Sequence, residues 1–261
     1  MHTLTSKDKT KIAYDIYGQG PPLIMITGAS CFRNFIPVKQ DAKAFAKHFT
    51  VYNYDRRARG DSGNESADKP YDINRELEDI EALIDAAGGE VILYGHSSGA
   101  VLALEATLKL GKKVSKLYIY DAPYVADETE KASYKKLGDT VNSLLTENKN
   151  AAAMKIFLSG IGMPKPFVAL LPFFPGWKTM KRLAPTLAYD IALTENLPPL
   201  ERLSRIDCPT VVMWGEKSPD GIHTVGQSIA SAISGARSIV IEGQDHMVSV
   251  HKLLPAMKQV E

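Results

Sequence analysis

Residues 91–106 read "VILYGHSSGAVLALEA": an apolar run, a serine between two glycines, and a run rich in alanine and leucine. The first run is typical of a buried strand, and the run from residue 98 onward is typical of a helix. A serine in the pattern Gly-x-Ser-x-Gly between a strand and a helix lies on a sharp turn that exposes its hydroxyl. The pentapeptide alone is weak evidence, since glycine and serine are both common. Its setting favours Ser97 as a nucleophile over a plain turn residue.

A serine nucleophile needs an oxyanion-binding site, a base and a carboxylate that orients the base. The backbone N–H of Ser98 lies at the start of the predicted helix, where unpaired donors and the helix dipole favour an anion. His246 follows the apolar run 238–241 directly, so it is the best-placed of the six histidines to act as the base. His251 lies in a helix-like run and is expected to face solvent. His96 is expected to point away from the serine and to have a packing or hydrogen-bonding role.

The rest of the chain alternates between strand-like and helix-like runs. Helical patterns occupy residues 71–87 and 98–110. This alternation predicts an α/β fold, with a mostly parallel central sheet of about eight strands flanked by helices. Ligands bind at the carboxyl ends of the strands in such sheets, so functional residues are expected just after strands. The strand-like runs are residues 12–17, 22–26, 50–54, 91–94, 116–120, 210–214 and 238–241.

The region from about residue 124 to residue 205 contains no convincing strand. Helical patterns occupy residues 134–145 and 151–158, followed by "MPKPFVALLPFFPGW". Prolines at positions 164, 166, 172 and 175 exclude one long helix there, while the phenylalanines and leucines are too apolar for a solvated loop. We interpret residues 123–205 as a helical cap inserted into a core domain formed by residues 1–122 and 206–261. The alternative is a set of additional helices of the core itself.

Composition restricts the class of protein. The chain has 261 residues, of which 44% are hydrophobic, and it carries 31 Lys and Arg against 30 Asp and Glu. This balance shows no electrostatic footprint for nucleic acid or an anionic membrane. Cys31 and Cys208 lie far apart in sequence and predict neither a disulfide framework nor a zinc site. The first residues lack a signal-peptide pattern and no apolar run is long enough to span a membrane, so we expect a cytoplasmic protein.

Several motifs together resemble the α/β-hydrolase fold superfamily, close to its small serine hydrolases and esterases with helical caps. The resemblance extends over nearly the whole chain and is specific for the fold. The motifs are "GHSSG" as the nucleophile elbow, "LIMITGAS" as the strand and oxyanion loop, "VYNYDRRARGDSG" as the next strand with its arginine loop, "CPTVVMWGEKSP" as the seventh strand, and "EGQDHM" as the histidine loop.

The resemblance implies that Ser97 is the nucleophile, that His246 is the general base, and that the N–H groups of Ala29 and Ser98 form the oxyanion hole. It implies no metal and no cofactor. Thr27 stands where many relatives carry histidine, which changes the support of the oxyanion loop but not its backbone donors.

The arginine loop also departs from the family pattern, with Ala58 where relatives often have glycine. Guanidinium groups of Arg56, Arg57 and Arg59 suit a substrate carboxylate. We favour the alternative, in which the loop is structural and held by salt bridges.

The acid that serves His246 is the open question. Relatives commonly carry Asp after the seventh strand, but this chain has Ser218 there, which cannot hold a negative charge. Asp220 is one candidate, if the loop is rearranged. Asp121, directly after the run 116–120, is the other, and some members of the superfamily place the acid there. We favour Asp121 over Asp220, with Asp245 third because its neighbour His246 would point elsewhere.

These observations predict a cofactor-independent serine hydrolase that cleaves an ester or related acyl bond of a small to medium, mainly hydrophobic substrate. The apolar composition of the cap indicates the hydrophobic pocket. Its partner is a small-molecule substrate; the oligomeric state is not predicted. Two alternatives remain: a ligand-binding protein of the same fold with little turnover, and a non-hydrolytic enzyme such as a lyase or a cofactor-free peroxidase. Because one fold hosts many reactions, the site has to decide among them.

Overall fold

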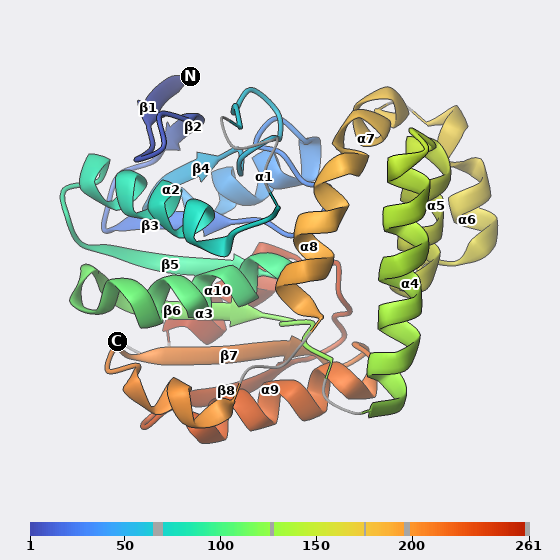
Figure 1. Ribbon diagram of the computed structural model, residues 1–261. Coiled ribbons are helices and arrows are strands. Elements are labelled where there is room, and N and C mark those ends of the chain that lie inside the picture. The colour runs from blue at the N-terminus through green and yellow to red at the C-terminus, as the bar shows by residue number, and fades with distance from the viewer. Residues whose placement is uncertain (65–69, 126–127, 175, 196–198, 259–261) are drawn as a thin grey trace.

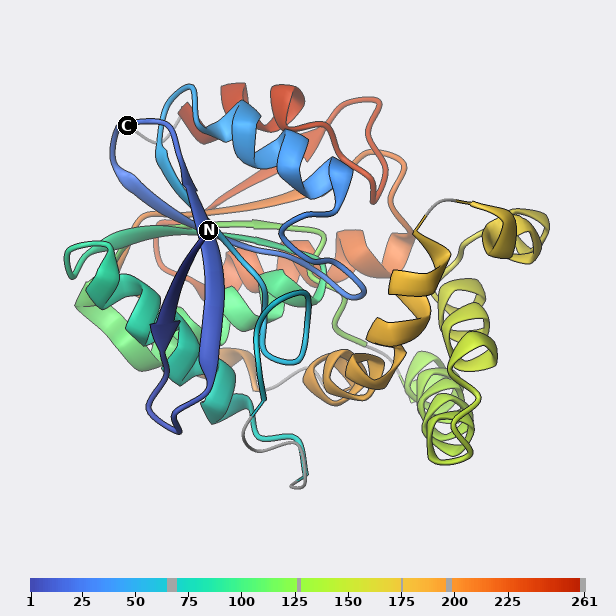
Figure 2. The same cartoon turned by 90° about the horizontal axis from the view of Figure 1, so that it is seen from above.

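The computed structural model describes residues 1–64, 70–125, 128–174, 176–195 and 199–258, and these residues form an eight-stranded sheet between two layers of helices (Figures 1 and 2). The strand order is β1-β2-β4-β3-β5-β6-β7-β8. β1 and β2 run antiparallel to their neighbours, and the remaining strands are parallel. The strands are β1 (His2–Thr5), β2 (Lys11–Tyr17), β3 (Pro22–Ile26), β4 (Thr50–Tyr54), β5 (Val91–His96), β6 (Val114–Tyr120), β7 (Thr210–Gly215) and β8 (Arg237–Ile241).

The predicted fold class is therefore confirmed. Each of the seven predicted strands is present, within a few residues of its predicted bounds. Strand β1 was not predicted, because its polar residues lie at the edge of the sheet, where only one neighbour is needed.

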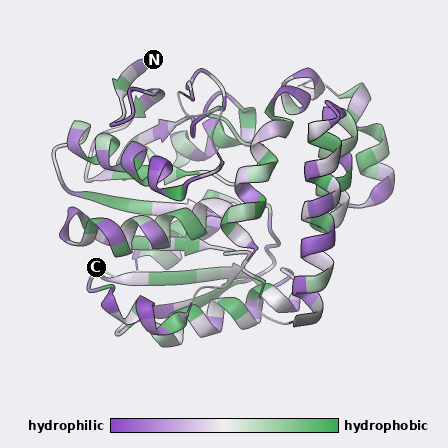
Figure 3. Cartoon of the chain, viewed as in Figure 1, coloured by the Kyte–Doolittle hydropathy of each residue, from purple (hydrophilic) through white to green (hydrophobic). Residues whose placement is uncertain are grey.

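The core consists of one apolar cluster on each face of the sheet. Side chains of β5 alternate between them: Val91 and Leu93 belong to one cluster, and Ile92 and Tyr94 to the other. This alternation follows from the two-residue period of a strand, and it explains why β5 is apolar along most of its length (Figure 3). Helices α2 (Ile73–Ala86), α3 (Ser98–Leu110) and α9 (Asp220–Ala232) cover the first face, and helices α1 (Ile36–Phe45) and α10 (Val250–Met257) cover the second.

Local signals define most of the predicted helix ends. Helix α2 begins after Asp72, whose carboxylate accepts a hydrogen bond from the N–H of Asn74, as an N-cap residue does. It ends before Gly88 and Gly89, which both have positive φ. Helix α3 has the predicted bounds, since it starts directly after the Ser97 turn and ends before Gly111.

Among the described residues, five α-helices follow β6 before the chain returns to the sheet at β7, and we call them the cap segment. They are α4 (Glu128–Thr146), α5 (Asn150–Gly160), α6 (Lys165–Leu170), α7 (Trp177–Leu183) and α8 (Leu187–Thr194), with short 3₁₀ turns at Leu171–Phe173, Ala184–Thr186 and Leu200–Arg205. No strand occurs among the described residues between β6 and β7. The prolines at 164, 166 and 172 lie at or near the starts of short helical segments, and Pro175 lies outside the described residues.

The cap segment has a third apolar cluster of its own, which includes Val141, Met154, Phe157 and Leu187. In Figure 1, α8 lies between the end of the sheet and the pair α4 and α5. Ala29, from the loop after β3, packs against this cluster. Among the described helices, none has the length and apolar character needed to cross a membrane.

Candidate active site

Ser97 lies on the turn between β5 and α3 with φ 58° and ψ −132°, a backbone conformation that few non-glycine residues adopt. The flanking glycines make this turn possible. A Cβ atom on Gly99 would lie 2.2 Å from the carbonyl oxygen of Ile26, and one on Gly95 would lie 2.4 Å from that of Gly99. The strand–turn–helix setting expected from the sequence is therefore present.

The loop after β3 lies directly against this serine. A Cβ atom on Gly28 would be 2.7 Å from Cβ of Ser97 and 3.2 Å from its Oγ atom. The peptide that joins Gly28 to Ala29 is thus next to the serine hydroxyl. Ser98 is the first residue of α3, so its N–H has no carbonyl partner within the helix. The structure accordingly places Ser98 directly after Ser97 at the start of α3, and Gly28, the residue before Ala29, against the Ser97 side chain.

His246 and Asp121 form a direct contact at the same edge of the sheet. The Nδ1 atom of His246 lies 2.9 Å from Oδ2 of Asp121. Asp121 is the first residue after β6, has φ 49°, and its side chain is fully buried. The hydroxyl of Ser218 donates to the same Oδ2 atom at 2.7 Å, and the N–H of Gly215 donates to Oδ1 at 3.1 Å. Two donors from the end of β7 therefore fix the carboxylate that faces the histidine.

The other two candidate carboxylates lie elsewhere. Asp220 is exposed at the first position of α9. Asp245 is exposed too, and its Oδ1 atom accepts a hydrogen bond from the N–H of Met247 at 2.8 Å. The sequence identified Ser218 only as the place of a missing carboxylate. In the structure Ser218 is a hydrogen-bond donor to the carboxylate of Asp121, which follows the neighbouring strand. An Asp after β6 combined with a Ser after β7 is the pattern that could have indicated this.

His96 lies beside His246 and supports its loop. Its Nε2 atom donates to the backbone carbonyl of His246 at 2.9 Å, and the two ring centroids are 4.9 Å apart. This is the hydrogen-bonding role expected from the sequence. Burial, and then the neighbouring imidazole of His246, lower the pKa of His96 from 6.5 to about 4. His96 is thus uncharged at neutral pH.

Further hydrogen bonds attach the histidine loop to the sheet. The hydroxyl of Tyr120 donates to the carbonyl of Asp245 at 2.6 Å, and the N–H of Lys217 donates to the carbonyl of Gln244 at 2.8 Å. The ends of β6 and β7 therefore position both the carboxylate and the histidine.

The arginine loop is buried and held by ion pairs. Arg57 binds both carboxylate oxygens of Asp79, at 2.7 and 2.9 Å, and Arg56 binds Glu76 in the same way, at 2.6 Å for each contact. These contacts support the structural interpretation of the loop, because the guanidinium groups already have carboxylate partners. Ala58 has φ 63°, a left-handed conformation that explains why relatives often carry glycine there.

Arg59 makes a contact that the sequence did not indicate. It forms an ion pair at 2.8 Å with Asp190, which lies in α8 of the cap segment. Asp190 also binds Arg56 at 2.9 Å. The only signal in the sequence is that Asp190 is a single carboxylate in the otherwise apolar helical run 187–193.

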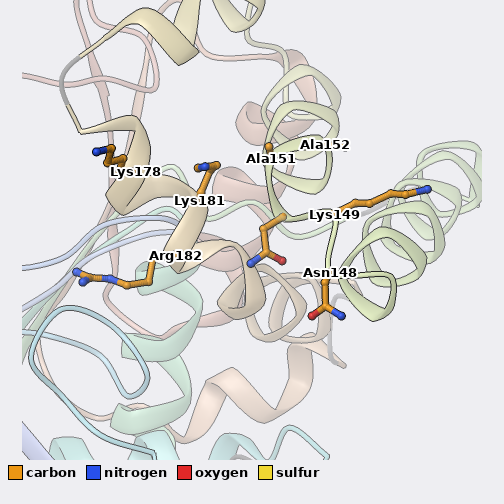
Figure 4. Close-up of a pocket in the computed structure, with 8 residues that line it drawn as sticks. Asn148, Lys149, Ala151, Ala152, Lys178, Lys181 and Arg182 are labelled. Atoms are coloured by element: carbon orange, nitrogen blue, oxygen red, sulfur yellow. The ribbon is translucent and has the colours of Figure 1, made fainter.

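A separate cavity of about 610 Å³ lies on the cap segment. Figure 4 shows it between α7, which contributes Lys178, Lys181 and Arg182, and the turn that joins α4 to α5. None of the residues around Ser97, His246 or Asp121 lines this cavity. The candidate active site is therefore defined by the hydrogen-bonded side chains at the sheet edge and not by this cavity.

Comparison with known proteins identifies the family. A family model described as "Alpha/beta hydrolase family" matches residues 17–252. The crystal structure of an alpha/beta hydrolase from Sphaerobacter thermophilus is 36% identical in sequence, with 99% of each chain covered and a TM-score of 0.86. A search among curated proteins gave no match. This chain belongs to the alpha/beta hydrolase family.

More distant structures share the fold. An esterase from Exiguobacterium antarcticum is 19% identical over 98% of this chain and 96% of its own, with a TM-score of 0.75. An enol-lactonase from Burkholderia xenovorans is 15% identical over 99% of this chain and 98% of its own, also with a TM-score of 0.75. At these identities the likeness concerns the fold alone.

The lowered pKa of His96 predicts a specific acid sensitivity. Between pH 6.5 and about 4, the unfolded chain binds more protons at this position than the native protein does, so stability falls as the pH is lowered through this window. In His96→Asn, the part of the pH dependence that comes from this residue disappears. Urea unfolding at pH 7 and pH 4.5 measures the difference.

His251→Asn is the matched control, since His251 is exposed on α10. It is expected to keep the wild-type change in unfolding free energy between the two pH values. Equal changes in the two variants would contradict the assignment of this sensitivity to His96.

Proposed function

We propose that this protein is a serine hydrolase that cleaves an ester or related acyl bond, with Ser97 as nucleophile, His246 as general base and Asp121 as the acid that orients it. The observation that carries this proposal is the 2.9 Å contact between Nδ1 of His246 and Asp121, at the sheet edge where the Ser97 turn lies. With Nδ1 committed to the carboxylate, the Nε2 atom of His246 is the nitrogen available to accept a proton.

In the proposed reaction, Oγ of Ser97 attacks the acyl carbon while His246 takes the hydroxyl proton. The C=O electron pair moves onto oxygen, and the N–H groups of Ala29 and Ser98 stabilise that oxyanion. When the pair returns, the bond to the leaving group breaks, and the leaving group takes the proton from His246. Water then repeats the sequence on the acyl-enzyme, releases the acid and restores Ser97.

The proposed substrate is a small to medium, mainly hydrophobic acyl compound. The support for this is the cap segment, whose apolar cluster packs against Ala29 of the oxyanion loop. The hydroxyl of Ser30, the next residue, also donates to the sulfur of Met154 in α5 at 3.4 Å. We therefore infer that the cap segment covers the acyl site and provides its apolar surface, as pockets for such ligands require.

The test is covalent labelling of the intact protein with a fluorophosphonate, followed by hydrolysis of p-nitrophenyl butyrate in ¹⁸O water. We expect stoichiometric labelling at Ser97, no labelling of Ser97→Ala, and one solvent oxygen in the butyrate released. Absence of labelling with the wild-type protein would contradict the proposal, as would turnover of the ester without incorporation of solvent oxygen.

A further inference from the structure

Asp190 of α8 joins the cap segment to the loops beside Ser97. Its side chain is buried, and its Oδ1 atom accepts hydrogen bonds from Arg56 at 2.9 Å, from Arg59 at 2.9 Å and from the hydroxyl of Ser98 at 2.7 Å. Its Oδ2 atom accepts a second one from Arg59 at 2.8 Å. One carboxylate thus contacts two arginines of the core and the residue after the proposed nucleophile.

Arg59 also binds the oxyanion loop, so it connects Asp190 to that loop. Its Nη1 atom donates to the carbonyl oxygen of Gly28 at 2.6 Å. That carbonyl and the N–H of Ala29 belong to the same trans peptide, so they point in opposite directions. By holding the carbonyl on its own side, Arg59 aims the N–H of Ala29 away from itself. Since a Cβ atom on Gly28 would lie 3.2 Å from Oγ of Ser97, this peptide lies beside the hydroxyl on which the proposed reaction begins.

Both proposed oxyanion donors are therefore connected to one side chain. Asp190 binds Ser98 directly, and the N–H of Ser98 is the second donor. Asp190 is connected to the Ala29 donor indirectly, because it binds Arg59 and Arg59 binds the carbonyl of Gly28. We propose that Asp190 is a positioning residue that aligns the two oxyanion donors, and that it makes their alignment depend on the docking of α8 against the core. This inference rests on the proposed function.

The charges of the cluster explain why Asp190 can act in this way. Burial opposes ionisation, but Arg59 and Arg56 outweigh it and hold the pKa of Asp190 below its usual value. Glu76 completes the cluster through Arg56. Two buried cations therefore face two buried anions, and a neutral residue at position 190 would leave Arg59 without its carboxylate partner.

Asp190→Asn tests the proposal by kinetics per active site, counted by fluorophosphonate titration. We expect kcat for p-nitrophenyl butyrate to fall about tenfold to a hundredfold, with KM changed less than about threefold, because the donors act mainly on the transition state. Inhibition by a trifluoromethyl ketone, which forms a tetrahedral oxyanion on the serine, should weaken by a similar factor. The non-reactive methyl ketone with the same carbon chain should bind to Asp190→Asn as tightly as it binds to the wild type.

Asp79→Asn is the matched control. Asp79 is equally buried and binds an arginine of the same loop, Arg57, at 2.7 and 2.9 Å. These hydrogen bonds join Asp79 to Arg57 and not to the oxyanion loop or Ser98. Asp79→Asn is expected to lower the melting temperature and to leave kcat per active site close to the wild-type value. Equal kcat values for Asp190→Asn and the wild type, or equal losses in both variants, would overturn the positioning role.

Two further outcomes keep the result interpretable. If Asp190→Asn does not fold, Ser98→Ala is the alternative variant. It removes the hydroxyl that donates to Asp190 and accepts from Arg56 at 3.3 Å, and it keeps the N–H donor. Ser98→Ala should raise the inhibition constant of the trifluoromethyl ketone about threefold to tenfold. An unchanged inhibition constant would overturn the proposal. Failure of the wild type to be labelled would overturn the proposed function itself, whereas normal labelling with unaffected variants overturns only the role of Asp190.

Discussion

Replacing Asp121 with asparagine is expected to lower kcat for ester hydrolysis by about ten-thousand-fold, because the amide cannot stabilise the imidazolium that forms on His246 and favours the wrong tautomer. The structure gives the reason for this choice of residue, since only Asp121 among the candidate carboxylates contacts Nδ1 of His246. Single-turnover kinetics with p-nitrophenyl butyrate measures the acylation rate directly.

Asp220→Asn is the control for this experiment. Asp220 is exposed on α9 and should affect the acylation rate less than about threefold. A large loss in Asp220→Asn together with a small loss in Asp121→Asn would reject the assignment of the acid.

A second variant tests whether a carboxylate at position 218 can replace that of Asp121. Ser218 and His246 both contact Oδ2 of Asp121, so the side chain of an aspartate at position 218 would begin at a backbone position near the imidazole of His246. In the Asp121→Asn background, Ser218→Asp is expected to restore about tenfold to a hundredfold of the lost rate. In the wild-type background the same substitution places two carboxylates side by side and should reduce activity at neutral pH.

Gly28→Ala is expected to lower kcat about a hundredfold with the fold retained. The new methyl group would lie 2.7 Å from Cβ of Ser97, so the oxyanion loop has to move away from the serine by several tenths of an ångström or more. Steady-state kinetics gives the loss of activity, and circular dichroism with thermal melting verifies that the protein is folded.

The control for Gly28→Ala is Gly221→Ala in α9. There the nearest atom to the new methyl group is a carboxylate oxygen of Glu130 at 3.1 Å, the end of a flexible side chain. This variant should keep the wild-type kcat. Wild-type activity in Gly28→Ala would show that the loop does not need its close approach to Ser97.

Hydrophobic periodicity sufficed to predict the fold, because buried parallel strands and the Ser97 turn have local sequence signals. It predicted α3 with its observed bounds and seven of the eight strands, while β1 was missed because an edge strand has little apolar pattern. The pairing of Asp121 with His246 was favoured from the position of Asp121 after a predicted strand and from the resemblance to superfamily members that place the acid there. The 123–205 cap boundary stays a prediction, and the roles of the site residues stay proposals.

Asp190 could not be predicted in the same way. Its three partners lie 92 to 134 residues away in sequence, so only the docking of α8 on the arginine loop brings them together. The hydrogen bond from Ser218 to Asp121 likewise depends on β6 and β7 being neighbours. Contacts between distant segments of this kind leave no periodic pattern in the sequence.

The position of Asp121 has a consequence for how this scaffold can vary. The N–H of Asp121 donates to the carbonyl of Met213, so the carboxylate is placed by the ladder between the adjacent strands β6 and β7 and not by a surface connection. The chain beyond Ser218, from Pro219 into α9, then carries no residue of the proposed acid–base pair. Insertions between Ser218 and Asp220, the first residue of α9, are therefore compatible with an intact site, and this connection is open to evolutionary drift or to engineering of substrate entry.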